Sequence, residues 1–104
     1  MPAVPVDPYV IDVLMADLVG HDRSPSSFLV YLYLYRRSHG RGAASVTVSL
    51  STLAVDVGLS RRAVQLALRN LVRRRLLRAN KAHATAVPVY SVLQTWRRTT
   101  AASN

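Results

Sequence analysis

The chain has no cysteine among its 104 residues. Disulfides, thiolate metal sites and a catalytic cysteine are therefore excluded, and the composition suits a reducing compartment. Long hydrophobic runs are also missing, and no segment has the length of a membrane span. The first residues do not form a signal peptide, because no Lys or Arg precedes Arg23 and the apolar residues are interrupted by Asp12 and Asp17. We expect a cytoplasmic protein without a membrane partner.

Acidic residues are scarce and unevenly placed. Four of the five lie within residues 1–22, where no basic residue occurs, and the last one in the chain is Asp56. Residues 23–104 hold all 14 basic residues against that one acidic residue, a net charge of +13. Such a field favours a polyanionic partner, and nucleic acid is the first candidate. A soluble surface in an arginine-rich protein would carry the same charge, so charge alone does not decide between the two.

The motifs of common enzymes are missing as well. The sequence has no P-loop, no GxSxG element and no glycine-rich dinucleotide turn. Its acidic residues give no plausible catalytic pair. Its three histidines, His21, His39 and His83, are far apart in sequence. We expect each to be a solvated loop residue without a metal-binding partner. The sequence therefore predicts no enzymatic activity, no catalytic residue, no metal and no cofactor.

Proline and cap residues organise the first part of the chain. Prolines at positions 2, 5 and 8 predict an extended arm over residues 1–6. Asp7 followed by Pro8 is a typical helix start. Apolar residues at helical spacing then predict a helix over residues 8–19, ended by Gly20. We assign residues 7–22 to this N-terminal helix, with a possible role in dimerisation.

The stretch FLVYLYLYRR, residues 28–37, is compatible with two structures. Its alternation of Leu and Tyr is typical of a strand, whereas apolar side chains on every side indicate a surrounded helix. Ser24-Pro25 is a helix-start signal, and no turn residue follows before Ser38. These signals favour a helix over residues 25–37, because propensity alone is a weak guide.

The rest of the chain divides into a predicted strand at 46–48, helices at 50–57 and 61–75, and strands at 76–80 and 87–96. Ser49 and Ser60 supply N-caps for the two helices, and Gly58 suits the sharp turn between them. Pro88 lacks an N–H and is expected at an edge or at the start of a strand. Residues 98–104 are predicted to be a flexible tail.

This succession of elements resembles the winged helix-turn-helix family of bacterial and phage DNA-binding domains. The resemblance covers roughly residues 24–96 and rests on Leu53, Ala54, Gly58, Leu59, Ser60, Val64, Leu68, Leu71, Leu76 and Leu77. It implies that residues 23–97 form a winged helix-turn-helix domain, a mainly α fold with a small β-hairpin wing. An extra N-terminal helix precedes this domain. The resemblance also implies association with the nucleoid. The family often has glycine where this chain has Arg75.

Helix 61–75 is predicted to have one apolar and one cationic side. The expected core side carries Val64, Leu68, Leu71 and Arg75. The opposite side carries Arg62, Arg69 and Arg73. No acidic residue follows Asp56, whereas an ordinary solvated helix mixes charges of both signs. A helix face of one sign suits a phosphate-lined groove.

The resemblance implies that this helix enters the major groove of DNA. The candidate DNA-binding residues are Ser60, Arg61, Arg62, Gln65, Arg69, Arg73, Arg78, Lys81 and His83. Arg62 and Gln65, with Arg61, are expected to reach base edges, since Arg pairs with guanine and Gln with adenine. For Arg61, the alternative to a base-edge contact is a contact with phosphate. The later arginines are expected to hold the backbone, the wing residues to reach phosphate or the minor groove, and Ser60 to act first as a cap.

These features predict sequence-specific binding of double-stranded DNA by a small homodimeric transcriptional regulator. Residues 8–19 and 25–37 are the expected dimer interface, and the alternative is that helix 8–19 folds back on its own domain. Two other functions stay open. One is a plasmid or phage replication or partition protein, which would use the same contacts. The other is a winged-helix protein-interaction module, which would show apolar anchors in place of the arginines.

Overall fold

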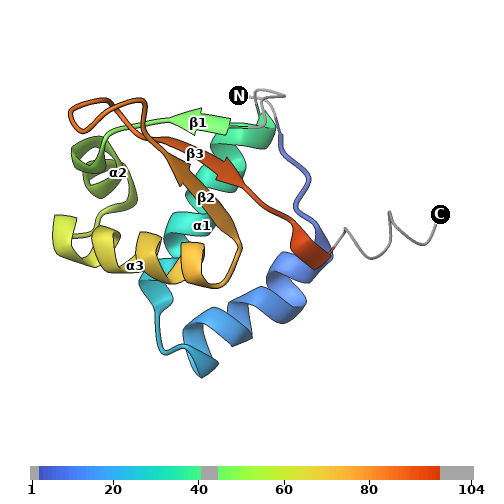
Figure 1. Ribbon diagram of the computed structural model, residues 1–104. Helices are drawn as coiled ribbons and strands as arrows, with labels where there is room; N and C mark the ends of the chain where they lie inside the picture. Colours follow the sequence, from blue (N-terminus) through green and yellow to red (C-terminus); the bar gives the residue numbers. More distant parts are fainter. Residues whose placement is uncertain (1–2, 41–44, 97–104) are drawn as a thin grey trace.

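Helices dominate the computed structural model, which describes residues 3–40 and 45–96. The elements are η1 (Val10–Leu14), η2 (Ala16–His21), α1 (Pro25–Gly40), β1 (Ser45–Thr47), α2 (Leu50–Val57), α3 (Arg61–Arg73), β2 (Leu77–Asn80) and β3 (Val89–Val92). The strands form one small antiparallel sheet, which lies above α3 and to the right of α2 in the view of Figure 1. The predicted fold class, a winged helix-turn-helix with an extra N-terminal helix, is confirmed. The predicted tail, 98–104, lies outside the described residues.

Helix α1 lies at the centre of the molecule. Its fully buried side chains within the described residues are Ser27, Val30, Tyr31, Leu34 and Ser38. The helix contacts every other described element except η1 and β2 closely, with α3 its main partner. Ser24 begins it, because its carbonyl oxygen accepts a hydrogen bond from the Ser27 N–H at 3.0 Å. The prediction of a surrounded helix over residues 25–37 is thus correct, and the helix runs three residues further, to Gly40.

A buried tyrosine ties α1 to the last strand. The Tyr31 hydroxyl donates a hydrogen bond to the carbonyl oxygen of Leu93 at 3.0 Å. Burial raises the pKa of Tyr31, and the nearby Tyr35 and Asp7 raise it further. The hydroxyl therefore stays protonated and acts as a donor at any physiological pH.

The segments η1 and η2 run on as one wide helix, which we call the N-terminal helix. Its hydrogen bonds span five residues, as in the bond from Asp22 N–H to the Asp17 carbonyl oxygen at 2.9 Å. This π-type pattern rarely extends beyond a single turn in proteins. Gly20 lies inside η2, so the expected end at Gly20 is wrong. The chain leaves the helix at Asp22 and turns at Arg23, whose φ is 52°.

The buried side of the N-terminal helix consists of Val10, Leu14 and Leu18. These side chains belong to the same core as α1, and η2 packs directly on that helix. The N-terminal helix thus folds back on its own domain, which is the alternative named above to a role only in the dimer interface. Any dimer contact through this helix has to use its outer side.

The start of the N-terminal helix is fastened to the end of the described chain. Asp7 Oδ1 accepts a hydrogen bond from the Tyr9 N–H at 2.9 Å, as expected of a cap. Asp7 Oδ2 accepts another from Trp96 Nε1 at 3.3 Å. The rings of Tyr9 and Trp96 stack with centroids 4.6 Å apart. Trp96 is therefore a packing residue rather than a platform for nucleotide bases.

The sheet has the order β1-β3-β2, so the last strand is its centre. Val46 of β1 pairs with Tyr90, and Leu77 of β2 pairs with Val92. Pro88 lies just before β3, where its missing N–H breaks no ladder bond, and its carbonyl oxygen accepts from Val48 N–H at 3.3 Å. Strands β2 and β3 are shorter than predicted and lie within the predicted segments, whereas β1 has the predicted length but begins one residue earlier, at Ser45.

The helix-turn-helix is formed by α2 and α3, and local sequence signals define its turn. Ser49 Oγ accepts from the Thr52 N–H at 3.1 Å, and Ser60 Oγ accepts from the Ala63 N–H at 3.0 Å. Gly58 has a φ of 81°, which glycine adopts without strain. Its N–H donates to the Ala54 carbonyl oxygen at 3.0 Å and closes α2. Helix α2 has the predicted bounds.

Helix α3 ends earlier than predicted, at Arg73. Arg75 has a left-handed φ of 59° and is exposed, so its assignment to the core side is wrong. That turn brings Leu76 and Leu77 into the core. A glycine, as the family often has here, would suit this conformation better. The fully buried side of α3 is instead Val64, Ala67 and Leu71.

Candidate nucleic-acid interface

The outer side of α3 presents the predicted DNA-binding residues to solvent. Arg61, Arg62, Gln65 and Arg69 are all exposed. Within the described ranges, none of these arginines forms an ion pair. The Ser60 hydroxyl is used by the helix cap, as predicted. Unpaired guanidinium groups on one helix side can donate to phosphates or to base edges.

Strand β2 and the loop that joins it to β3 carry the other predicted donors. Arg78, Lys81 and His83 are exposed. The loop is closed by its own contacts: the Ala86 N–H donates to the His83 carbonyl oxygen at 3.0 Å, and Lys81 Nζ donates to the Ala84 carbonyl oxygen at 3.4 Å. In Figure 1 it extends above α2, at the end of the molecule remote from the N-terminal helix.

A hollow of about 400 Å³ lies between α3, the sheet and the start of α2. It is lined by Leu50, Gln65, Leu68, Arg69, Val72, Ala79, Lys81, Pro88 and Tyr90. The hollow therefore brings Gln65 and Arg69 of α3 together with Lys81 of the wing. Arg78 does not line it; that residue borders a separate hollow of about 320 Å³ together with Arg75.

The arginines near the C-terminal end of α3 have different surroundings from those near its start, because acidic residues of the N-terminal helix contact this end. The Arg74 guanidinium pairs with Asp17, and its Nε lies 3.2 Å from Asp22 Oδ2. Asn70 Nδ2 donates to Asp22 Oδ2 at 3.0 Å. The charge of Arg74 is therefore offset within the molecule.

Asp22 is the most enclosed acid of this contact, with only 6% of its side chain exposed. Burial by itself would raise the pKa of Asp22. Hydrogen bonds from His21 and Asn70 and the charge of Arg74 outweigh burial and hold the pKa below its ordinary value of 3.8. Asp22 is therefore ionised at neutral pH and serves as the acceptor of this contact.

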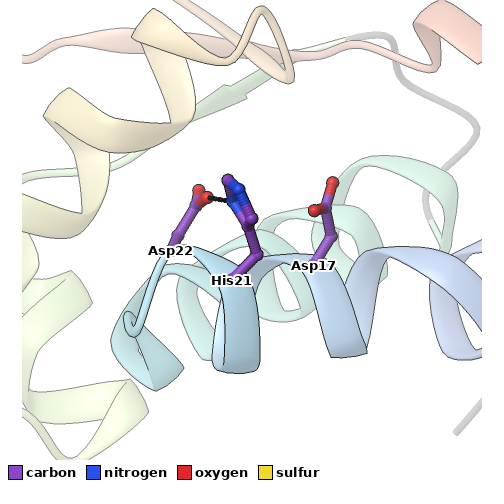
Figure 2. A group of neighbouring side chains, drawn as sticks. All are labelled: Asp17, His21 and Asp22. Carbon is purple, nitrogen blue, oxygen red and sulfur yellow. Dashed lines mark hydrogen bonds and ion pairs between the residues drawn. The ribbon is translucent and has the colours of Figure 1, made fainter.

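Three potential metal ligands lie together here: Asp17, His21 and Asp22 (Figure 2). Their ligand atoms lie within 4.8 Å of one another, and all three side chains point the same way from the helix. The expectation that His21 is a loop residue without an acidic neighbour is wrong, because it ends η2 and its Nδ1 lies 3.0 Å from Asp22 Oδ1. Both carboxylates already pair with Arg74, so the cluster acts as an anchor for that guanidinium.

Comparison with family models agrees with this architecture. A family model described as a helix-turn-helix domain matches residues 24–77, more than half of the chain. The chain belongs to the helix-turn-helix domain family. The matched segment covers α1 to α3 of this helix-turn-helix protein and reaches the start of β2. Membership indicates DNA binding. Comparisons with curated proteins and with solved structures gave no significant match.

Sequence reasoning about this helix-turn-helix protein missed the residues that hold the end of α3. Neither Asn70 nor Asp22 is among the candidate binding residues that the sequence indicates. The one available signal was the concentration of acidic residues before Arg23 in an otherwise basic chain. The side chain of His39 lies outside the described residues. No helix in the described ranges has the length and apolar character to cross a membrane.

Proposed function

We propose that this helix-turn-helix protein binds double-stranded DNA in a sequence-specific manner and acts as a small dimeric transcriptional regulator. The observation that carries the proposal is the outer side of α3, where exposed arginines without acidic partners continue into a hollow shared with the wing. An α-helix fits the major groove of B-DNA, and a cationic rim beside it favours the flanking phosphates.

The proposed roles follow the position along α3. Arg61, Arg62 and Gln65 lie in the first turns, and the N-terminal residues of a recognition helix usually reach base edges. Arg69 and Arg73 lie further along and would hold the phosphate backbone. Such contacts position the protein but carry no sequence information directly.

The wing residues Arg78, Lys81 and His83 would contact phosphate or the minor groove beside the helix. Lys81 is the best supported of the three, because it lines the same hollow as Gln65 and Arg69. A ligand that fills this hollow would touch helix and wing together.

Fluorescence anisotropy with a labelled duplex tests the proposal directly. If about six phosphates are contacted, log K should fall with log salt with a slope of about −5. A single strand of the same sequence is the control, and it should bind more weakly than the duplex if binding requires the major groove. A flat salt response of the duplex would reject DNA binding through the cationic side and favour a protein-interaction module.

The dimeric part of the proposal is supported by the outer side of the N-terminal helix. Ile11, Met15 and Val19 lie four residues apart and are exposed, Ile11 to 47%. Leu29 of α1 is exposed as well. Two copies joined through such a surface would place their recognition helices on half-sites about one helical turn, roughly 10 bp, apart.

Sedimentation of Ile11→Glu tests the dimer without removing core residues, which deletion of the helix would do. We expect the wild type to sediment as a dimer and the variant as a monomer, because a buried unpaired carboxylate opposes association. Val55→Glu is the matched control, since Val55 is 79% exposed on α2. A monomeric wild type, or a dimeric Ile11→Glu variant, would remove this surface from the proposal.

A further inference from the structure

Two neighbouring arginines at the end of α3 have different surroundings. Arg74 is half-buried and paired with Asp17 and Asp22. Arg73 is exposed, and its guanidinium donates to Asn70 Oδ1. Arg73 has no ion pair within the described residues, so its positive charge remains open to solvent.

The orientation of the Asn70 amide is dictated by its other neighbours. Its Nδ2 donates to Asp22 Oδ2 at 3.0 Å and to Ser27 Oγ at 3.1 Å. An ionised carboxylate can only accept hydrogen bonds, so the NH₂ group of the amide must face Asp22. The carbonyl oxygen of Asn70 then has to face the other way, where it accepts from Arg73.

The residues behind Asn70 are themselves fixed. Ser27 is fully buried, and its Oγ lies 2.6 Å from Ser24 Oγ. Asp22 is nearly enclosed and is also held by His21 and Arg74. The amide of Asn70 thus rests on a rigid support provided by the N-terminal helix and the start of α1.

We infer that Asp22 and Asn70 are positioning residues for DNA binding, which hold the Arg73 guanidinium in place for one backbone phosphate. The inference rests on the proposed DNA-binding function. A long arginine side chain loses rotamer freedom when it binds, and a side chain already held in one orientation loses less. Arg74, by contrast, serves as the anchor that keeps the N-terminal helix against α3.

Asp22→Asn gives a test in which the sign of the effect is decisive. Simple electrostatics predicts tighter binding of a polyanion once a negative charge is removed. The positioning role predicts weaker binding, by at least about twofold, because the amide of Asn70 loses the carboxylate that orients it. Asp12→Asn, on an exposed acid of the same helix, is the matched control and should bind as the wild type or slightly tighter. Unchanged or tighter binding by Asp22→Asn would overturn the inference.

A double-mutant cycle gives the second test, with a mixed-sequence duplex at low salt as the probe. Asn70→Ala should weaken binding about threefold to tenfold in the wild type and have no effect in Arg73→Ala, since Asn70 acts through Arg73. Circular dichroism confirms that each variant is folded at the assay temperature. Equal losses in both backgrounds, or no loss in either, would overturn the inference while wild-type binding persists. A wild type that does not bind the duplex would instead reject the proposed function.

Discussion

The two ends of α3 carry the same kind of charge in opposite settings. At the N-terminal end, Arg61 and Arg62 are exposed, and the Ser60 hydroxyl caps the helix. At the C-terminal end, Arg74 is paired with two carboxylates contributed by a segment some 50 residues away. The difference teaches that a cationic helix is not a uniform ligand surface. Its function at each position depends on whether an acidic residue from elsewhere in the fold reaches it.

The largest effect expected at the anchored end is on stability. Leu18→Ala should lower the free energy of unfolding by about 2–5 kcal/mol, because Leu18 is fully buried between the N-terminal helix and the core. Urea unfolding measures the change. Val19→Ala is the matched control, since the neighbouring side chain is exposed and should cost far less. Equal losses for the two variants would show that the N-terminal helix does not pack in this way.

A smaller effect, on recognition, should separate the two ends. Arg62→Ala should reduce discrimination between a selected duplex and a scrambled one by about 1–3 kcal/mol, if Arg62 contacts a base edge. Arg74→Ala should leave discrimination unchanged, because the Arg74 guanidinium is paired with Asp17 and Asp22 of its own chain and is not available to a base edge. Competition binding with duplexes selected from a random pool measures both. A loss of discrimination in Arg74→Ala alone would reverse the comparison.

The smallest effect concerns pH. The pKa of Asp22 is lowered in the folded protein, so the folded state binds fewer protons than the unfolded state as pH falls. The stabilisation by Asp22 is therefore fully present above its ordinary pKa of 3.8 and is lost as the pH drops through the lower, folded value. Urea midpoints at about pH 5 and pH 2 should differ less for Asp22→Asn than for the wild type. An identical pH dependence would remove Asp22 from the anchor.

Much of the fold could be predicted because its signals are local. Ser49 and Ser60 cap helices that begin where predicted, and Gly58 adopts the backbone conformation for which it was singled out. The surrounded helix α1 followed from apolar residues on all its sides. Each of these signals acts over a few residues and needs no knowledge of what packs against the element.

The errors arose where a distant contact decides the local structure. The helical pattern of α3 continues past Arg73, but the burial of Leu76 and Leu77 forces the chain out of the helix at Arg75. Spacing along one helix does not reveal that Asp17 and Arg74 meet, since they lie 57 positions apart. The proposed base-reading residues could be named from the sequence, whereas the support behind Arg73 required coordinates.

The position of β3 in the sheet has a consequence for synthesis of the chain. Both β1 and β2 form their hydrogen bonds with β3, and neither pairs with the other. While the ribosome is still adding residues before Val89, the motif and its preceding helix exist without any completed sheet. The Tyr31 hydroxyl likewise has no Leu93 carbonyl oxygen to donate to until that residue has been added. The domain can therefore close only after translation has passed this last strand, so a stalled or nicked product lacking it would lose both strand pairings at once.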